Sequence, residues 1–309
     1  MADKATRDAF GEALKALGAK NPKIVALDAD LSCSTKSAIF AKAFPERFFQ
    51  MGIAESNMVG TAAGLALGGY VPFICSFGCF LTGRYETIRM SVGYCEANVK
   101  IVGTHAGIGI GEDGNSQMGL EDVALMRAIP GMTVFQPCDE YSTHAAVEYA
   151  ATHEGPFYLR LTRQKLPNLY RDNQVFQSGR GIILKEGKKL ALLGTGATVI
   201  EALRASEELA NYNPWVIDIH TLKPIDRALV RTLATSCDHI VTIEDHSLIG
   251  GLGSAVAEVL AEVPDSRAQL IRIGVEAFGE SGDPSALYEK YGLSAPQIVQ
   301  KLKAKLPNN

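Results

Sequence analysis

The 309-residue sequence lacks the features of several protein classes. It holds one Trp and six Cys with no Cys-x-x-Cys pair, so neither density nor spacing indicates a disulfide scaffold. We interpret the cysteines as reduced, mostly buried thiols of a cytoplasmic protein. Thirty Lys and Arg against thirty-four Asp and Glu leave no excess of positive charge. This balance argues against nucleic-acid binding driven by bulk positive charge, and we expect no nucleic-acid partner.

Common catalytic and metal-binding motifs are also missing. Neither Gly-x-Ser-x-Gly nor Gly-x-x-x-x-Gly-Lys-Ser/Thr occurs, which argues against the commonest hydrolases and P-loop enzymes. The string at 193–199 matches a dinucleotide loop only in part because Val199 replaces the third Gly, so a plain strand-to-helix turn is favoured. The glycines at 250–253 predict a similar turn, whose helix N-terminus could hold an anion. His239 and His246 lack the spacing of a helical metal pair, and we expect no metal site formed by this chain alone.

Charged side chains are absent from residues 56–83, a length that could span a bilayer. The run Gly-Gly-Tyr-Val-Pro at 68–72 interrupts this stretch where a spanning helix would have to continue. The pattern predicts a buried helix, a turn and a buried strand, and no membrane partner. The first residues are charged and precede no apolar segment, so we expect no secretory signal.

Helical periodicity and short β-branched runs alternate along the chain. This alternation is typical of βαβ units, which form a mainly parallel sheet covered on both faces. The polar stretch at 163–189 interrupts it, and a domain boundary is expected there. The predicted fold class is α/β with two doubly wound domains. The predicted helices are 4–18, 53–67, 85–95, 120–128, 141–152, 199–210, 226–234, 253–263, 285–291 and 295–305, and the predicted strands are 23–27, 71–76, 99–104, 132–136, 157–161, 190–193, 215–219, 239–244 and 269–273.

Glu55 is the last acidic residue before the charge-free stretch and falls in the first turn of a predicted buried helix. A carboxyl there is poorly solvated, so we expect a raised pKa that leaves it protonated near neutral pH. The helix dipole alone also favours an acid in a first turn. The residue pattern leaves both interpretations open.

Short motifs occur in an order that resembles the C-terminal half of transketolase. They are Ala5-Thr6-Arg7, Asp28-Ala29-Asp30-Leu31, Gly52-Ile53-Ala54-Glu55, Ser76-Phe77-Gly78-Cys79-Phe80-Leu81, Thr104-His105, Gly111-Glu112-Asp113-Gly114, Leu120-Glu121-Asp122, Arg160-Leu161-Thr162-Arg163-Gln164 and Lys223-Pro224-Ile225-Asp226. Each motif is weak alone, but their order and spacing together cover nearly the whole chain. The resemblance implies a pyrimidine-binding domain over 1–170, a linker over 171–186 and a transketolase C-terminal domain over 187–309.

The resemblance also implies thiamin diphosphate as the cofactor. In the family, the carboxyl at the position of Glu55 hydrogen-bonds the N1′ nitrogen of the aminopyrimidine, so that the cofactor's own 4′-nitrogen can take the proton from thiazolium C2. Phe77 and Phe80 match aromatic residues that pack on the pyrimidine, although core packing would bury them too. Asp30 is carried over as a further cofactor-binding residue. A third aromatic of some relatives is replaced by Gly83-Arg84.

A site for the phosphate of a sugar substrate follows from the same resemblance. Arg7, Ser34 and Arg163 match the family's residues that hold this phosphate, and a guanidinium fork suits such a dianion. On residue type alone, Arg7 could be an ordinary surface charge and Ser34 an ordinary helix cap.

The rest of the substrate has predicted contacts as well. His105 and Asp113 match positions at the sugar hydroxyls and the reacting carbonyl, and His105 joins Glu55 as a predicted catalytic residue. Gln117 stands where many microbial and plant members have His, as in the animal-type form. Its amide can bond a hydroxyl but cannot donate a proton of comparable acidity.

Gly-Asp-Gly, which in the family binds the divalent cation and the diphosphate, occurs nowhere in the sequence. The resemblance therefore implies a separate N-terminal subunit that supplies this cradle and its Mg²⁺ or Ca²⁺. We expect a heterotetramer with two chains of each kind and assign no metal ligand to this chain.

The implied activity is transfer of a two-carbon ketol unit from a ketose phosphate to an aldose phosphate, as in the pentose phosphate pathway. The β subunit of a 2-oxoacid dehydrogenase is the nearest alternative, although Gly-Glu-Asp-Gly followed by Leu-Glu-Asp favours transketolase. Deoxyxylulose-phosphate synthase shares the architecture on a longer chain. A catalytically silent binding subunit is disfavoured because Glu55, His105, Asp113 and Arg163 occur together. Unusual substrates, such as branched or sulfonated ketose phosphates, stay open.

Overall fold

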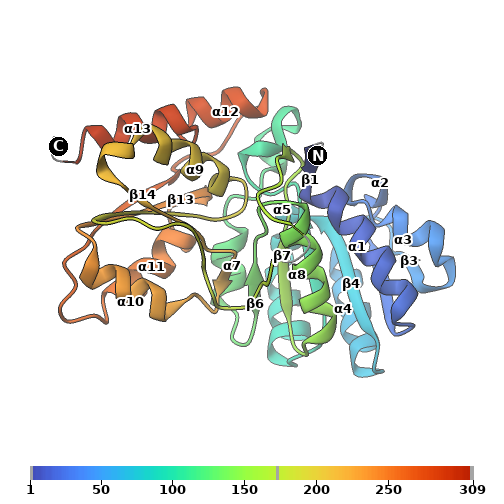
Figure 1. The fold of residues 1–309 in the computed structure, drawn as a ribbon. Helices are drawn as coiled ribbons and strands as arrows, with labels where there is room; N and C mark the ends of the chain where they lie inside the picture. The colour runs from blue at the N-terminus through green and yellow to red at the C-terminus, as the bar shows by residue number, and fades with distance from the viewer. Residues whose placement is uncertain (1–2, 172–173, 307–309) are drawn as a thin grey trace.

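The computed structural model describes residues 3–171 and 174–306, and two mainly parallel sheets organise them (Figure 1). The first sheet has the strand order β12-β6-β7-β5-β4-β2-β3, and all neighbours are parallel except β12 and β6. Its strands are β2 (Ile24–Asp28), β3 (Phe48–Gln50), β4 (Val71–Phe77), β5 (Lys100–Thr104), β6 (Thr133–Phe135), β7 (Phe157–Arg160) and β12 (Thr221–Lys223). Parallel pairing places the carboxyl ends of β2, β4 and β5 at one edge, where α/β proteins bind ligands.

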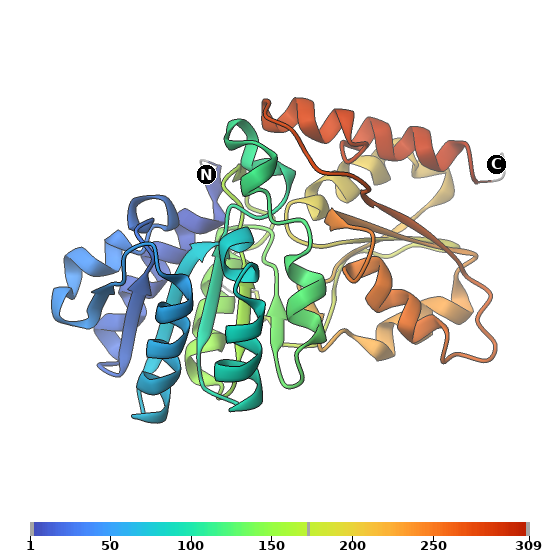
Figure 2. The ribbon, with the colours of Figure 1, turned by 180° about the vertical axis from the view of Figure 1, so that it is seen from behind.

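Helices cover both faces of this sheet because successive strand residues point to opposite sides. Phe73 packs in the cluster under α1 (Thr6–Lys20) and α8 (Glu140–Thr152), which lie in front of the sheet in Figure 1. Its neighbour Ile74 packs in the cluster under α4 (Glu55–Leu67) and the π-helix η2 (Ile88–Tyr94), which come to the front in Figure 2.

The second sheet has the order β14-β13-β10-β11-β9, with β9 antiparallel at its edge. Leu192 faces α9 (Thr198–Glu208) and α13 (Ala295–Lys303), whereas Leu193 faces α10 (Arg227–Ser236) and α11 (Leu252–Leu260). The strands are β9 (Ile182–Lys185), β10 (Leu190–Gly194), β11 (Trp215–Asp218), β13 (His239–Ser247) and β14 (Gln269–Val275).

Short elements complete the described chain. They are β1 (Lys4–Ala5), α2 (Ser32–Thr35), α3 (Ala38–Ala43), η1 (Pro45–Arg47), α5 (Gly78–Thr82), α6 (Tyr85–Thr87), η3 (Ile108–Asp113), η4 (Asn115–Gln117), α7 (Asp122–Ala128), β8 (Lys165–Leu166), η5 (Ala210–Tyr212) and α12 (Pro284–Lys290). Among the residues described, no helix is both long and apolar enough to cross a bilayer.

The predicted fold class, two doubly wound α/β domains, is confirmed. Five strands are not among those predicted from the sequence: β1 and β8 have two residues each, and β3, β9 and β12 are short edge strands without an alternating pattern. β9 lies inside the predicted linker 171–186, and β12 returns from the second half of the chain to pair with β6. The predicted domain boundaries, 1–170, 171–186 and 187–309, stay a prediction. Residues 1–2, 172–173 and 307–309 of these ranges lie outside the described residues.

The predicted helix at 85–95 is broken into α6 and the π-helix η2. The cysteines are free thiols, and Cys75, Cys138 and Cys237 are buried. Cys33 and Cys95 are exposed, which differs from the expectation of mostly buried thiols.

Candidate functional site

The predicted site residues come from segments that meet at the carboxyl edge of the first sheet. Phe77 ends β4, and His105 follows the last residue of β5. Glu55 opens α4 just beyond β3, and Arg7 lies in the first turn of α1. Because the strands are parallel and each helix returns antiparallel to them, these positions share one edge. Arg163 joins them from the segment after β7.

His105 is buried and bonded through both ring nitrogens. Its Nδ1 lies 2.9 Å from Thr104 Oγ1, which itself donates to the Ser76 carbonyl, and its Nε2 lies 2.6 Å from Arg7 Nη1. Arg7 can only donate, so Nε2 accepts and Nδ1 carries the hydrogen. Burial, followed by the positive charges of Arg7, Arg163 and Lys36, lowers the pKa of His105 to about 3. The imidazole is therefore neutral and acts as a fixed hydrogen-bonding group.

Two phenylalanines extend from this imidazole as a stack. Phe77 is buried and stacks on His105, with ring centroids 3.8 Å apart. Phe80, in α5, stacks on Phe77 at 5.4 Å with planes only 9° apart, and it is half-buried. Such a stack presents a flat apolar face, which is the surface that another aromatic ring prefers.

Glu55 is 6% exposed, as expected for an acid at the start of a buried helix. Its Oε2 lies 3.7 Å from Nη2 of Arg84, whose side chain is 49% exposed. The prediction that Glu55 is protonated stays a prediction. Beyond this carboxyl, α4 exposes Gly60 and Gly64, where an added Cβ would meet nothing within 4 Å. The carboxyl therefore borders an uncovered, uncharged helix face.

The predicted phosphate residues lie together with Asp113. Arg7 Nη1 donates to the Ser34 carbonyl at 3.1 Å, so Ser34 contributes its backbone rather than a helix-capping hydroxyl. Arg163 Nη1 donates to the Ile110 carbonyl at 2.7 Å and lies 3.6 Å from Asp113 Oδ1. The positive charges of Arg7 and Arg163 both act on His105, and although Glu112 pairs with Arg163 at 3.1 Å, two neighbouring guanidinium groups favour an anion.

Three predicted polar residues form no hydrogen bond or ion pair with this group in the part of the chain that the structure describes: Glu55, whose partner is Arg84, and Asp30 and Gln117. Asp30 is exposed with a φ of 64°, and its backbone N–H donates to Gln50 Oε1 at 2.8 Å. The Gln117 carbonyl accepts from Cys79 Sγ at 3.2 Å. Within residues 3–171 and 174–306, no hydrogen bond joins the side chain of Asp30 or Gln117 to the other predicted site residues.

Sequence reasoning missed residues that hold the site in shape. Asp28 is fully buried and accepts from Leu31 N, Thr35 Oγ1 and Ser37 Oγ, which fixes the segment that carries Ser34. Burial raises the pKa of this carboxyl. Its place at the end of an apolar strand was the available signal. Thr104 orients His105 through its hydroxyl, and like Asp28 it occurs within one of the motifs of the resemblance.

The glycine turn at 250–253 already holds a carboxyl group supplied by the protein. The Glu244 carboxylate accepts from Leu252 N at 2.7 Å and from Gly253 N at 2.9 Å. Burial raises the pKa of Glu244 to about 7. The expectation of an open anion site at this helix N-terminus is wrong, because a side chain from β13 fills it.

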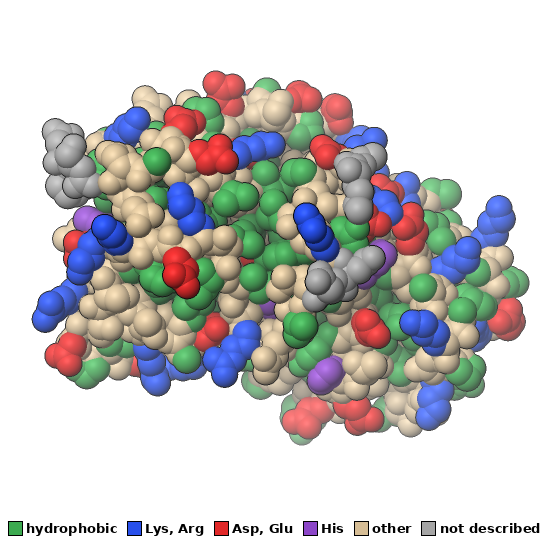
Figure 3. All heavy atoms as spheres, viewed as in Figure 1, with side chains coloured by type: hydrophobic (Ala, Val, Ile, Leu, Met, Phe, Trp, Pro, Cys, Tyr) green, Lys and Arg blue, Asp and Glu red, His purple; other side chains and the backbone are tan. Residues whose placement is uncertain are grey.

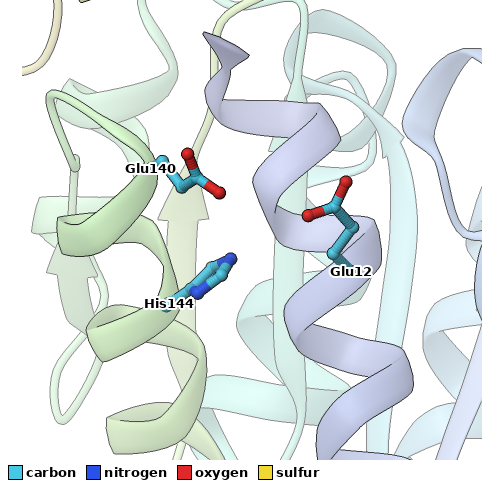
Figure 4. A group of neighbouring side chains, drawn as sticks. All are labelled: Glu12, Glu140 and His144. Atoms are coloured by element: carbon cyan, nitrogen blue, oxygen red, sulfur yellow. The ribbon is translucent and has the colours of Figure 1, made fainter. Parts of the chain in front are cut away.

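One group in the described chain has metal-ligand character, namely Glu12, Glu140 and His144 (Figure 4). Glu12 comes from α1 and the other two from α8, whose side chains point toward α1, and the ligand atoms all lie within 4.8 Å of one another. Lys4 Nζ donates to Glu12 at 2.8 Å and to Glu140 at 2.6 Å. The Lys4 ammonium thus already supplies the positive charge that these carboxylates require.

The surface carries charges of both signs interspersed on the face shown in Figure 3. Hydrophobic side chains gather there where the two halves of the chain meet. A cavity of about 760 Å³ lies between the halves, lined in part by Leu166, Ile200, Arg204 and Tyr288.

Two family descriptions match the sequence over almost its whole length. Residues 2–168 match "Transketolase, pyrimidine binding domain" and residues 179–298 match "Transketolase, C-terminal domain". A Methanocaldococcus jannaschii protein named as a transketolase C-terminal section is 46% identical over 97% of this chain and 95% of its own length. A subunit of a 6-deoxy-6-sulfo-D-fructose transketolase from Clostridium sp. (strain MSTE9) is 42% identical over 95% of this chain and 92% of its own.

Longer relatives match over only half of their length. Human transketolase is 39% identical over 97% of this chain, which spans 48% of that protein. A solved structure described as a split-gene transketolase in an inactive β4 tetramer superposes with a TM-score of 0.88 and 47% identity, and it covers 98% of both chains.

Proposed function

We infer that this chain, which belongs to the transketolase family, acts as the C-terminal subunit of a two-chain enzyme. Together with a separate N-terminal subunit it transfers a two-carbon ketol unit from a ketose phosphate to an aldose phosphate. One observation supports this most strongly: the chain spans nearly all of the split relatives but half of human transketolase. The sequence also lacks Gly-Asp-Gly throughout.

The residues present fit one end of thiamin diphosphate. A buried carboxyl at Glu55 and the stacked rings of Phe77 and Phe80 offer a hydrogen-bonding group and an apolar ring face, which an aminopyrimidine requires. When bound, thiamin diphosphate supplies a carbon nucleophile and an electron sink. The diphosphate and its Mg²⁺ or Ca²⁺ would be held by the partner.

Each group of this chain then has a proposed task. Glu55 hydrogen-bonds the pyrimidine nitrogen, while Phe77 and Phe80 hold the ring plane. His105 is kept neutral by burial and by Arg7, and its Nε2 accepts from Arg7; we propose that Nε2 exchanges this bond for one from a sugar hydroxyl when the Arg7 guanidinium turns to the phosphate. Arg7 and Arg163 bind the phosphate.

Four further residues have proposed contacts with the substrate or the cofactor. Asp113, beside Arg163, bonds a sugar hydroxyl, and Gln117 offers an amide near α5. The backbone around Ser34 borders the phosphate, and Asp30 borders the cofactor.

The partner subunit has a suitable place to dock. Ile53 just before α4, Leu67 at the end of α4 and Tyr94 at the end of η2 are 83%, 77% and 79% exposed. Exposed large apolar side chains along these two neighbouring elements favour a protein interface. Docking there would cover the carboxyl and enclose the pyrimidine. We propose a heterotetramer with two chains of each kind, in the cytoplasm, serving a pathway of pentose phosphate type.

Reconstitution with the N-terminal subunit tests the proposal. The chain alone should bind thiamin diphosphate poorly and show no ketol transfer, whereas the complex should transfer ketol units. Glu55→Ala should lower the turnover of the complex by several orders of magnitude, since Glu55 is the group proposed to hydrogen-bond the pyrimidine nitrogen. Glu148→Ala, an exposed acid on α8 across the sheet, is the matched control and should leave turnover unchanged. Near-normal turnover of Glu55→Ala would refute the assignment.

A sulfonated ketose is a second candidate donor because of the 42% identical sulfofructose transketolase subunit. A guanidinium pair binds sulfonate as well as phosphate. Competing fructose 6-phosphate against 6-deoxy-6-sulfofructose on the complex distinguishes the two donors. Activity with 2-oxoacids and a lipoyl carrier, but with neither sugar, would favour the dehydrogenase alternative.

A further inference from the structure

Two side chains of the second half of the chain hold the backbone of residues 107–113, which we call the substrate loop. Asp245, near the end of β13, accepts a hydrogen bond from Ile108 N at 2.8 Å. Tyr288, in α12, donates to the other oxygen of that carboxylate at 2.8 Å. Asp245 is 2% exposed and Tyr288 6%. A charge-assisted bond so deeply buried strongly restricts the backbone it contacts.

The loop is closely fitted to this support. A Cβ at Gly107 would overlap the Asp245 carboxylate, and one at Gly111 would lie 3.1 Å from Pro284 Cγ. Both glycines have positive φ, of 83° and 82°, a region that other residues rarely adopt. Ser281 Oγ adds a bond of 2.7 Å to the Glu112 carbonyl. The second half therefore holds the loop both at its start and near its end.

The loop in turn joins the groups of the sugar-phosphate pocket. It begins two residues after His105 and ends at Asp113, and Arg163 Nη1 donates to the Ile110 carbonyl at 2.7 Å. A shift of the loop would move Asp113 and change the direction of the Arg163 guanidinium.

We propose that Asp245 and Tyr288 are positioning residues for substrate binding: they act through the substrate loop and touch neither substrate nor cofactor. The proposal rests on the proposed function. It gives the second domain a task in sugar-phosphate affinity that is separate from the thiamin site at Glu55 and Phe77. Displacing the loop should weaken substrate binding without changing the chemistry at the cofactor.

Tyr288→Phe tests this because it removes one hydroxyl and keeps the ring. Amide hydrogen exchange of residues 107–113 in the full chain should rise about ten-fold, and KM for the ketose phosphate should rise about ten-fold in the complex. The value of kcat should stay within about two-fold, and thiamin diphosphate affinity should not change. Tyr291→Phe is the matched control, since its hydroxyl bonds Phe278 O and Glu280 instead.

The possible results distinguish a failure of the positioning role from a failure of the proposed ketol-transfer function. Exchange and KM equal to those of Tyr291→Phe would overturn the positioning role, as would a loss of kcat with unchanged KM. If the wild-type complex transfers no ketol unit, the proposed function fails while the exchange measurement still decides the role in the loop. If Tyr288→Phe does not fold, Asp245→Asn takes its place: it removes the charge of the acceptor of Ile108 N, and about a ten-fold rise in KM is expected.

Discussion

Phe77 lies flat against His105, with ring centroids 3.8 Å apart and planes inclined by 24°. Because Phe80 stacks on Phe77 in turn, the three rings form a column from the buried imidazole to a half-buried outer ring. Position in the column decides what each ring contributes. The inner ring supports the fold and the imidazole, and the outer ring offers its face to a ligand.

Truncating the two phenylalanines should therefore have different effects. Phe77→Ala should lower the free energy of unfolding by about 3 kcal/mol, because it opens a cavity in the core. Phe80→Ala should lower it by under about 1.5 kcal/mol but weaken thiamin diphosphate binding to the complex about ten-fold through lost stacking. Urea unfolding and a cofactor titration measure both quantities. Equal stability losses in the two variants would contradict this division.

His105 should make the protein less stable in acid. Its pKa is about 3 in the fold against an ordinary value of 6.5, so between these values the unfolded chain binds a proton that the folded chain does not. Stability is then lost as the pH falls below 6.5, by up to about 1.4 kcal/mol per pH unit. His105→Gln should flatten this slope in urea unfolding from pH 7 to 5.

Other buried histidines should keep part of the pH dependence of stability in His105→Gln. Burial lowers the pKa of His220 and of His246 to about 4, so they retain part of the acid slope in the variant. His153→Gln, at an exposed site stacked on Tyr149, is the control and should keep the wild-type slope. Identical slopes for His105→Gln and the control would count against a buried neutral imidazole.

Asp218 should make the protein less stable as the pH rises, which is the opposite of the effect of His105. Tyr170 and Cys138 donate to its Oδ2, at 2.8 and 3.5 Å, and burial raises its pKa to about 7. From about pH 4 to 7 the folded chain keeps a proton that the unfolded chain has released, so stability is lost as the pH rises. Asp218→Asn should reduce this loss in unfolding measured from pH 5 to 8. Asp238→Asn, an exposed acid paired with Lys189, should not.

Sequence patterns predicted the elements with strong periodicity and missed those that long-range pairing creates. The apolar runs at β4 and β5 are fully buried parallel strands, which such runs indicate directly. β12 has only three residues, Thr-Leu-Lys, and exists because it pairs with β6 from far away in the chain. No local pattern specifies such a partner.

In the site, too, some features can be predicted from the sequence and others depend on contacts between distant segments. Residue type and motif order indicated His105 and Arg7, but their contact and the resulting neutral imidazole depend on the fold. Asp245 carried no local signal, since its carboxylate acts on a loop 137 positions earlier in the chain. Groups that position others are recognised only when the segments they connect are seen together.

The buried ion pair between Asp122 and Arg160 should contribute strongly to the free energy of unfolding. Arg160 Nε lies 2.8 Å from Asp122 Oδ2, and Arg160 Nη2 donates to the Gly119 and Asp245 carbonyls, so this side chain ties the two halves of the chain together. Arg160→Leu should lower the free energy of unfolding by about 3–5 kcal/mol, because it leaves the Asp122 carboxylate buried without its partner.

Urea unfolding of two further variants isolates the cause of that loss. Adding Asp122→Asn to Arg160→Leu should restore part of the stability, since the second change removes the unpaired charge. Arg204→Leu breaks an exposed pair with Glu201 on α9 and should cost under about 1 kcal/mol. If Arg160→Leu were no more costly than Arg204→Leu, the junction between the two halves would have to be held by its apolar contacts instead.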